Sequence, residues 1–405
     1  MKTILVISTL DTKRGETIYL KNKINELGKH AVIIDISMRK GEVLEGDIPA
    51  YKVAMAGGSK YDEILTSQER AKNTAIMTKG AINIALDIWK NGKLHGIIGI
   101  GGSTGSLMAT DVMRALPFGV PKLMISSTAA LPGMSTRYID IGDIALFHSV
   151  VEISGLSDVL KNVIDRGAYA ICSMVDAPSI NTTRDRKKNK AIAITMLGPC
   201  EKCASSVRTH LESKGYQVTG FSAAGIGDRA MEIMISQGFF DGVIDLAPGG
   251  VIEHLVGGMR DAGPYRLEAA SRAGIPQVIS TCGVNHITPP KSKYTDDHKS
   301  RRKYDLDRFR TWLRASPDEL KRAAQVFAQK INISTAPVKI VIPTKGWSSV
   351  DTPGSLTYDP KEDRIFIEEL RKYIKEGIDI IEIEANMEEP LFAESIMNAC
   401  YELFK

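Results

Sequence analysis

The sequence lacks long hydrophobic runs and has few cysteines. Its apolar stretches reach about 6–7 residues, well short of the ~20 that a membrane-spanning helix needs. The start, Met1-Lys2-Thr3, shows no signal-peptide pattern. Five cysteines, an odd number scattered over 405 residues, do not make a disulfide framework. These absences predict a cytoplasmic protein with no membrane partner.

Neither sign of charge dominates. The 52 Lys and Arg residues against 48 Asp and Glu residues leave a net charge of +4. This excess is too small to indicate binding to nucleic acid or to an acidic membrane by charge alone. What is present is 43% hydrophobic and 25% charged residues, the balance of a globular protein with ample core material. The length predicts two domains.

Short β-branched runs alternate with segments of helical periodicity. We expect strands at residues 3–8, 31–36, 96–100, 121–126 and 138–147, and helices at residues 14–27, 68–91, 103–115 and 157–170. This alternation is typical of a parallel sheet with helices on both faces. The predicted fold class is α/β, with two Rossmann-like doubly wound lobes and mostly parallel sheets.

A polar, basic stretch at residues 181–190 interrupts this pattern and is typical of a linker. We place the domain boundary there, which gives an N-terminal nucleotide-binding domain at 1–182 and a C-terminal Rossmann-like domain at 190–405. The second half repeats the first at an offset of 187 residues, the separation of Gly28 and Gly215. Gene duplication and a merely shared strand–helix–strand pattern both explain this repeat.

The strongest local motif is Gly99-Ile100-Gly101-Gly102-Ser103-Thr104-Gly105-Ser106, which follows a buried strand and opens a helix. Glycines allow a ligand close to the backbone, and free amides at a helix start favour an anion. The motif is neither a P-loop nor a dinucleotide fingerprint. It is similar to the glycine-rich turns of phosphofructokinase-like and NAD-kinase-like folds, and we predict phosphate binding. The alternative is a tight turn without a ligand.

Two further loops follow predicted strands and end at the same sheet edge. In the first, Thr9, Asp11 and Thr12 suit helix capping, whereas Lys13 opposes the helix dipole unless an anion lies beside it. We therefore expect Lys13 to bind phosphate and Asp11 to hold Mg²⁺ or a ribose. The second loop is rich in hydroxyl groups and includes Ser127 and Thr128.

These motifs resemble the UPF0261 family, the Tm-1-like ATP-binding proteins. The resemblance rests on ordered segments along nearly the whole chain: Thr9–Lys13, Gly99–Ser103, Pro121-Lys122, Ser126-Ser127, Asp143-Ile144, Ser149–Leu156, Thr195–Gly198, Arg229–Glu232, Gly257-Gly258, Ala262–Pro264, Arg266–Ala270, Pro276–Val278, Asp351–Gly354 and Phe392-Ala393. It implies two Rossmann-like domains, ATP binding in the first, and a homo-oligomer. It implies no particular reaction.

The sequence departs from the family pattern at four places. It has Leu131–Met134 where Ala-Ser-Gly-Asp is expected, Ala247–Gly250 where a threonine run followed by Glu is usual, Gly283–His286 where Gly-x-x-Asp is expected, and Leu306–Arg308 where His-Asn-Pro is expected. The nucleotide site therefore transfers better than any site of the second domain. The expected ATP contacts are Thr9, Asp11, Thr12, Lys13, Gly101, Gly102, Ser103, Thr104, Gly105, Ser127 and Thr128.

The second domain carries candidates for acid–base chemistry at its own loop edge. They are Glu253, His254, His286 and Lys345, with isolated surface residues as the alternative. Cys200 and Cys203 invite a redox interpretation, but a helix start with incidental thiols explains them better. No second ligand pair completes a zinc site, so we expect no metal bound by the protein itself.

We therefore expect an ATP-binding protein that acts on a small acidic metabolite in a cleft between the lobes, most simply as a homodimer. Two alternatives stay open. One is a non-catalytic regulatory module that uses the nucleotide to stabilise a binding surface. The other is an ATP-independent sugar-acid hydrolase or isomerase. The sequence leaves open whether the protein is an enzyme.

Overall fold

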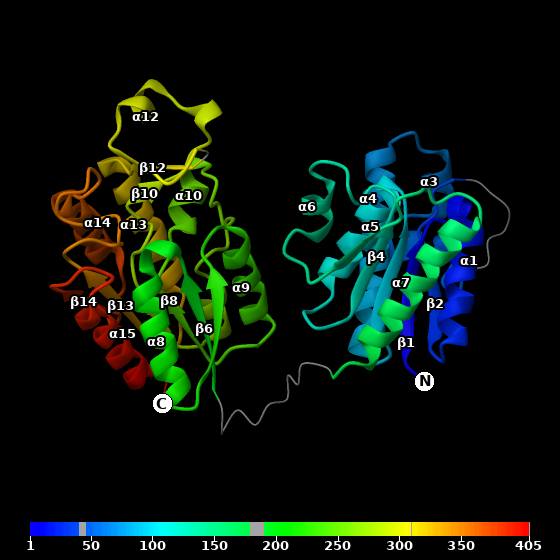
Figure 1. The fold of residues 1–405 in the computed structure, drawn as a ribbon, viewed down its shortest axis with the longest axis horizontal. Coiled ribbons are helices and arrows are strands. Elements are labelled where there is room, and N and C mark those ends of the chain that lie inside the picture. Colours follow the sequence, from blue (N-terminus) through cyan, green and yellow to red (C-terminus); the bar gives the residue numbers. More distant parts are fainter. Residues whose placement is uncertain (40–45, 179–189, 309, 405) are drawn as a thin grey trace. The chain divides into compact units, whose positions relative to one another are not determined.

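The computed structural model describes residues 1–39, 46–178, 190–308 and 310–404. The chain divides into two compact units, Met1–Ile180 and Asn181–Lys405 (Figure 1). Of the basic stretch predicted as the linker, residues 181–189 lie outside the described residues. No helix in the described ranges is both long and apolar enough to cross a membrane.

The first unit is built on a five-stranded parallel sheet. Its strands are β1 (Thr3–Ser8), β2 (His30–Asp35), β3 (Gly96–Gly101), β4 (Lys122–Ser126) and β5 (Ala145–His148), in the order β2-β1-β3-β4-β5. Gly101 pairs with Ser126, and Ser126 with His148, so β3, β4 and β5 end level with one another. β3 and β4 are buried throughout because helices cover both faces of the sheet.

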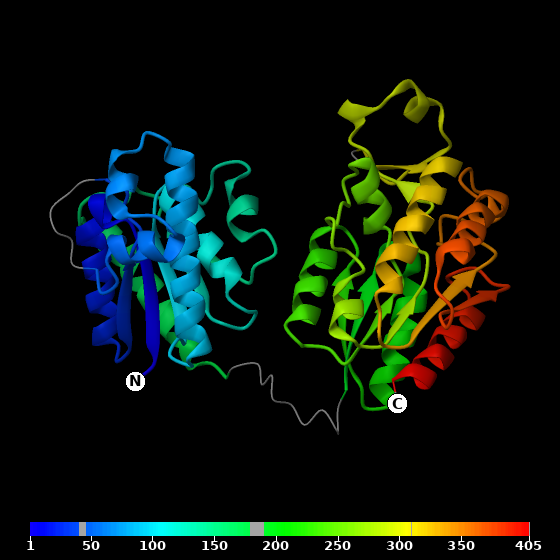
Figure 2. The ribbon, with the colours of Figure 1, turned by 180° about the vertical axis from the view of Figure 1, so that it is seen from behind.

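Two helical layers enclose this sheet (Figures 1 and 2). One face packs on α1 (Leu10–Glu26) and α7 (Asp158–Asp176), and the other on α2 (Ala50–Gly57), α4 (Arg70–Lys90) and α5 (Ser103–Ala115). The short helices α3 (Tyr61–Thr66) and α6 (Met134–Ile139) lie in connections. All the loops that follow the strands reach the carboxyl edge of the sheet, where ligands bind in folds of this kind.

The second unit contains a six-stranded parallel sheet. Its strands are β6 (Ala191–Met196), β7 (Gln217–Ser222), β8 (Gly242–Asp245), β9 (Gln277–Ile279), β13 (Val338–Pro343) and β14 (Asp379–Ile383), in the order β14-β13-β9-β8-β6-β7. One face packs on α8 (Glu201–Ser213) and α15 (Pro390–Leu403), and the other on α10 (Gly250–Val256), α13 (Pro317–Asn332) and α14 (Pro360–Tyr373). α9 (Ile226–Ser236) packs against α11 (Ala269–Ala273).

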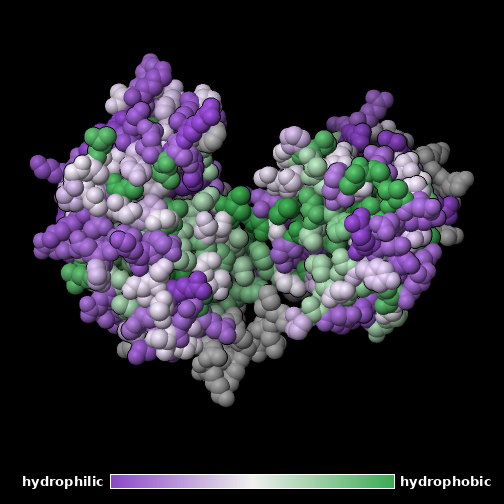
Figure 3. Space-filling view, in the orientation of Figure 1, coloured by the Kyte–Doolittle hydropathy of each residue, from purple (hydrophilic) through white to green (hydrophobic). Residues whose placement is uncertain are grey.

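A small antiparallel sheet adds to the second unit. β10 (His286–Ile287), β12 (Thr311–Arg314) and β11 (Lys303–Asp305) form it in that order, and α12 (Asp296–Ser300) lies between β10 and β11 in the chain. Hydrophilic side chains gather over the α12 segment on the face drawn in Figure 3. The strands of this sheet, of two to four residues each, were not among those expected from the sequence.

The predicted fold class is confirmed, and one predicted strand is largely wrong. Residues 138–147 were expected to form one strand. Tyr138 instead lies in the last turn of α6, and the strand that pairs with β4 is Ala145–His148. The repeat places equivalent strands in equivalent positions: β2-β1-β3-β4-β5 corresponds to β7-β6-β8-β9-β13. Gly28 and Gly215 both have positive φ, at 76° and 89°, where each helix returns to an edge strand.

Candidate functional site

A cavity of about 390 Å³ opens at the carboxyl edge of the first sheet. Three helix starts line it: those of α1, α4 and α5. The lining residues are Thr9, Asp11, Thr12, Lys13, Met38, Arg39, Ser67, Arg70, Asn73, Gly102, Ser103, Thr104 and Gly105. The structure thus brings the predicted Thr9–Lys13 segment and the glycine-rich turn together. The volume of the cavity is within the range of small-molecule sites.

The start of α5 presents backbone amides that have no partner in the described parts of the chain. Its first helical hydrogen bond runs from the amide of Ser106 to the carbonyl of Gly102, at 2.8 Å. No hydrogen bond in the described ranges uses the amides of Ser103, Thr104 or Gly105. Gly102, the N-cap residue, has no side chain to accept from them. Such amides, together with the positive end of the helix dipole, suit an anion.

The glycines keep this end of the cavity open. A Cβ built on Gly105 would meet no atom within 4 Å, and one on Gly102 would meet only Ser127 Oγ, at 3.9 Å. Gly101 has less space around it, because a Cβ added there would lie 3.4 Å from the Cα of Gly105. A ligand can therefore approach Gly102 and Gly105 closely, whereas Gly101 is held by packing within the turn.

Two arginines that the sequence analysis did not single out lie in the cavity wall. Arg70, the first residue of α4, donates from Nη2 to Thr104 Oγ1 at 3.2 Å. Arg39 follows β2 and is exposed. Neither guanidinium forms an ion pair within the described ranges. Both positive charges are therefore available to a ligand.

Lys13 and Asp11 line the cavity but are also bonded to neighbouring loops. Lys13 Nζ donates to the carbonyl of Ile153 and lies 3.5 Å from Glu152 Oε1. Asp11 Oδ2 accepts from the amides of Met38 and Arg39, both at 3.2 Å. Each group thus holds a loop to the start of α1. Asp11 keeps its other oxygen, Oδ1, without a hydrogen bond in the described parts of the chain.

Of the remaining predicted contacts of the first unit, Thr9 and Thr12 line the cavity, whereas Ser127 and Thr128 are not among its lining residues. Thr9 and Thr12 share a hydrogen bond between their hydroxyl groups, at 3.0 Å. Ser127 Oγ is buried next to Gly102 and has no hydrogen-bond partner among the described residues. Thr128 Oγ1 is bonded to the hydroxyl of Tyr138, at 2.6 Å, and so supports α6.

The four acid–base candidates of the second unit do not form one group. Glu253 is fully buried and accepts from Arg260 Nη2, at 2.6 Å, and from Thr288. His286 lies near it, since Arg260 also donates to the His286 carbonyl. His254 Nδ1 is instead hydrogen-bonded to Asp261 Oδ1 at 2.9 Å, and Lys345 forms an ion pair with Glu384 at 3.2 Å. Both contacts are exposed.

Burial determines the protonation state of His286. Both its ring nitrogens lack a hydrogen-bond partner in the described ranges, and its ring lies 5.5 Å from that of Trp312. Burial lowers the pKa of His286, and the nearby Arg314 and Arg260 charges lower it further. The imidazole is therefore neutral at physiological pH, packed inside the unit and away from solvent.

The loop edge of the second sheet is closed by its own backbone and by buried charges. A Cβ on Gly249 would lie 2.5 Å from the Gly283 carbonyl, and one on Gly283 would lie 3.1 Å from Arg260 Nη1. Arg266, fully buried, pairs with Asp245 at 2.6 Å and lies 3.5 Å from Asp228. Burial raises the pKa of Asp228 to about 6.

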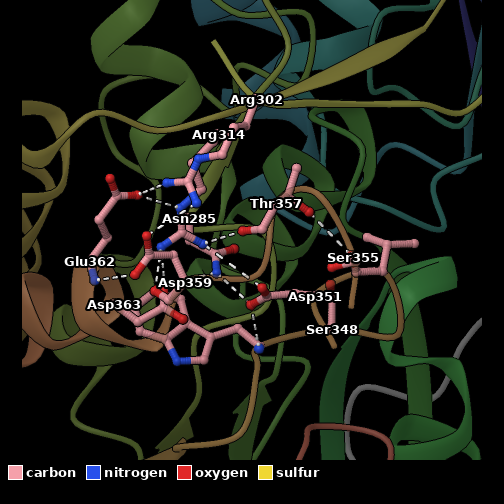
Figure 4. A network of polar contacts seen from close by, with 12 residues as sticks. Asn285, Arg302, Arg314, Ser348, Asp351, Ser355, Thr357, Asp359, Glu362 and Asp363 are labelled. Atoms are coloured by element: carbon pink, nitrogen blue, oxygen red, sulfur yellow. Dashed lines mark hydrogen bonds and ion pairs between the residues drawn. The ribbon is translucent and has the colours of Figure 1, made fainter. Parts of the chain in front are cut away.

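A second buried network joins two carboxylates through one amide (Figure 4). Asn285 Nδ2 donates to Asp351 Oδ2 at 2.7 Å and to Asp363 Oδ1 at 3.0 Å. Arg314 donates to Asp363 at 2.6 Å and to Glu362 at 3.1 Å. Burial raises the pKa of Asp363 to about 7, with the Asp351 charge acting in the same direction.

The cysteines of the second unit are packed inside it. Cys200 and Cys203 are at most 1% exposed, and burial raises the pKa of the Cys203 thiol. The amide of Cys203 donates to Glu388 at 3.2 Å, so the start of α8 already has an anionic partner. Buried thiols of raised pKa are poor nucleophiles, which agrees with the non-redox interpretation.

Metal ligands are sparse in the described ranges. They contain no group of three or more His, Cys, Asp or Glu residues placed to hold a metal ion. Asp11 is the carboxylate that lines the first-unit cavity. Because Mg²⁺ is commonly held by one or two carboxylates together with substrate phosphates, Asp11 Oδ1 fits a metal that arrives with a nucleotide.

Comparison with known proteins gives matches over nearly the whole chain. The model of the N-terminal domain of the uncharacterised protein family UPF0261 matches residues 2–179, and that of the C-terminal domain matches residues 189–404. A UPF0261 protein of Clostridium tetani is 32% identical over 396 residues, which is 97% of this chain and 96% of that protein. One from Brucella suis is 30% identical over 96% of this chain and 93% of its own length.

A plant protein and a solved structure extend the comparison. The tomato ToMV resistance protein Tm-1(GCR237) is 30% identical over 335 residues, 81% of this chain, which spans 44% of that protein. A crystal structure of UDP-N-acetylglucosamine 2-epimerase aligns over 93% of this chain and 92% of its own, at 10% identity and a TM-score of 0.22. A likeness this low carries no conclusion about activity.

Proposed function

The chain belongs to the UPF0261 family, and the open cavity lies in the unit that matches the N-terminal domain of that family. We propose that this unit binds ATP together with Mg²⁺. One observation carries the proposal. Three successive amides without partners, at Ser103–Gly105, face the same cavity as two arginines that form no ion pair within the described residues. A polyphosphate chain supplies the negative charge and the acceptor oxygens that these groups lack.

Each wall of the cavity has a distinct role in this proposal. The amides of Ser103–Gly105 cradle one phosphate group, and the arginines neutralise its charge. Asp11 Oδ1 takes the metal that accompanies the phosphates, or a ribose hydroxyl. Lys13 contributes positive potential from its place beside Glu152, although its ammonium group is bonded to the Ile153 carbonyl.

Within this proposal, a binding module fits the first-unit site better than a catalyst. No His or Cys lines the cavity in the described part of the chain, and its carboxylate, Asp11, already accepts from two amides. Hydroxyl groups such as that of Ser103 line the cavity, but no histidine in the described ranges lies beside them to act as their general base. If the protein is instead an enzyme, the small acidic metabolite would supply the reacting group. We further propose that it works in the cytoplasm, as a homo-oligomer.

Thermal unfolding in the presence of ligand tests the proposal. MgATP at 100 times its dissociation constant should stabilise the native state by about 2.7 kcal/mol, and so raise the melting temperature. Gly102→Val should abolish this rise, because its side chain fills the space beside the amides and φ there, −81°, suits valine. Gly198→Val, which also meets open space but lies in the second unit, is the matched control.

The outcomes separate binding from catalysis. A full ATP-induced rise in Gly102→Val would place the nucleotide elsewhere and overturn the proposal. Incubation with ATP and candidate acidic metabolites then distinguishes the two functional classes. Sustained release of ADP or phosphate identifies an enzyme, whereas binding without turnover supports the module.

A further inference from the structure

We propose that Arg70 is the side chain that recognises phosphate in this cavity, acting as a bidentate clamp on the group seated at the start of α5. The inference rests on the proposed function and names a residue within it. Arg70 donates to Thr104 Oγ1 at 3.2 Å, and Thr104 is one of the three residues at the start of α5 whose amides have no partner. The guanidinium and the amide cradle are therefore neighbours.

The guanidinium has donors to spare. It carries five N–H groups, and in the described ranges only the bond to Thr104 is formed. The planar fork of arginine matches two oxygens of one phosphate, which a lysine ammonium does not. The bond to Thr104 keeps the guanidinium beside the α5 amides, where a phosphate would be seated.

The charge of Arg70 is placed against the preference of its own helix. It is the first residue of α4, where the positive end of the helix dipole disfavours a cation. Lysines 13 and 72, in contrast, lie close to the acids Glu152 and Glu69. A phosphate bound between α4 and α5 would remove this unfavourable arrangement, because its charge faces both helix starts.

Lys13, the cation expected from the sequence, is less suitable for this role. Its side chain is only 16% exposed, and its ammonium is bonded to the Ile153 carbonyl next to Glu152. To reach a phosphate on α5 it would have to leave this bond. Arg70 makes its one hydrogen bond to a neutral hydroxyl, which a charged phosphate oxygen readily replaces.

Binding of three probes to four proteins tests the inference. The probes are MgATP, adenosine and inorganic tripolyphosphate, measured by calorimetry on the full-length parent chain and on Arg70→Gln, Arg70→Lys and Lys79→Gln. Lys79 is the matched control, since it is exposed on the same helix but does not line the cavity.

Arg70→Gln should weaken MgATP and tripolyphosphate by about tenfold or more and leave adenosine unchanged, because charge-assisted hydrogen bonds are lost. Arg70→Lys should recover only part of this loss, because the charge returns without the fork. Lys79→Gln should bind all three probes like the parent. The melting temperature of ligand-free Arg70→Gln should be no lower than that of the parent, because a cation at the start of α4 opposes the helix dipole. Weaker binding is then not the result of a less stable protein.

The results separate this inference from the proposed function. If the parent binds neither MgATP nor tripolyphosphate, the proposed function fails and the inference with it. If the parent binds them and Arg70→Gln binds them equally well, only the inference is overturned. If Lys79→Gln weakens binding as much as Arg70→Gln does, the effect is one of general charge and the clamp is refuted.

Discussion

The residue that begins a helix determines what its first amides bind. Three helices have an N-cap residue whose side chain accepts a hydrogen bond from an amide in the first turn. These residues are Ser157 before α7, Ser316 before α13 and Asp359 before α14. Gly102 begins α5 and has no side chain with which to accept. No cap side chain therefore competes with a ligand for the first amides of α5, whereas in each of the other three helices the cap side chain accepts from one or two of them.

A substitution at Gly105 should separate helix stability from ligand binding. Gly105→Ala should stabilise the ligand-free protein by about 0.4–1 kcal/mol, because alanine loses less backbone entropy on folding and its Cβ meets no atom within 4 Å. In saturating MgATP the gain should shrink or reverse, since the methyl group enters the phosphate space. Urea unfolding with and without ATP measures both values.

Gly15→Ala is the control for this prediction. Gly15 lies in α1, outside the cavity, and its Cβ also meets open space. The free energy of unfolding that Gly15→Ala gains should be the same with and without ATP. Equal gains for both variants in the presence of ATP would show that the ligand does not approach Gly105.

Asp363 should make the stability of the second unit depend on pH. Its folded pKa of about 7 lies above the ordinary value of 3.8, so the folded state holds a proton that the unfolded state has released. This group therefore lowers stability progressively as pH rises from about 4 to about 7, and no further above that. Asp363→Asn removes the titration while its side-chain oxygen can still accept from Arg314.

Chemical unfolding of Asp363→Asn at pH 5 and pH 8 measures this effect. The free energy of unfolding of the variant minus that of the parent should be larger at pH 8 than at pH 5. Glu394→Gln, an exposed carboxylate on α15 of the same unit, should show no such difference. A parent-minus-variant difference that is independent of pH would contradict the raised pKa of Asp363.

At the scale of elements, the loop from β5 to α7 is held in a strained turn. The amide of Val151 donates to the Ser149 carbonyl at 2.7 Å, and Val150 between them has φ of 64°. This conformation is unfavourable for a β-branched residue. Two bonds fix the loop to α1: Lys13 reaches the Ile153 carbonyl, and Glu16 accepts from the amide of Gly155.

Val150→Gly should therefore stabilise the first unit. The Val150 side chain is 78% exposed, so its loss removes little packing, while glycine adopts positive φ without strain. We expect a gain of about 1 kcal/mol in the free energy of unfolding, measured in urea. Val159→Gly, an exposed valine in the first turn of α7, should instead lose stability; a loss at Val150 as well would refute the strain.

Elements with strong local signals could be predicted from the sequence. The strand at residues 3–8 and the helix at residues 103–115 match β1 and α5, because an apolar run and a glycine before a helix are local features. The strand at 138–147 failed because its apolar residues are divided between α6 and β5. β10, β11 and β12, with two to four residues each, depend on pairing between distant segments and carry little local pattern.

The site was predicted in part for the same reason. The glycine-rich turn and Thr9–Lys13 follow strands, so the topology of a parallel sheet brings them together. Arg70 lies 32 residues before Gly102 on an ordinary polar helix start, and only tertiary structure places it at the cavity. Glu253 and His286 each follow a predicted strand, a position that suggests catalysis, but their burial against Arg260 is not visible in the sequence.

At the scale of the molecule, we expect the two units to be separable near residues 180–190, with trypsin cleavage at Arg184–Lys190. Five basic residues in this range are cleavage sites for trypsin: Arg184, Arg186, Lys187, Lys188 and Lys190. Limited digestion should cut there first and leave two stable fragments of comparable size, as gels and mass spectrometry would show. Resistance there with early cleavage elsewhere would count against this boundary.

We also expect a closed homo-oligomer, most simply with twofold symmetry. Light scattering at micromolar concentration should give a mass of at least twice the 44.2 kDa of the chain. A mass equal to that of one chain would refute this expectation.

The matching strand orders of the two units have a consequence for how each tolerates change. After β3, the turn at Gly102–Gly105 faces open space, so substitutions there leave the fold intact and, in the proposed function, would alter which ligand binds. After β8, the equivalent turn at Gly249 lies against the Gly283 backbone, and a larger residue there would separate two loops. New specificity can therefore arise at the first edge by single substitutions, whereas the second edge can change only if its neighbouring loops change with it.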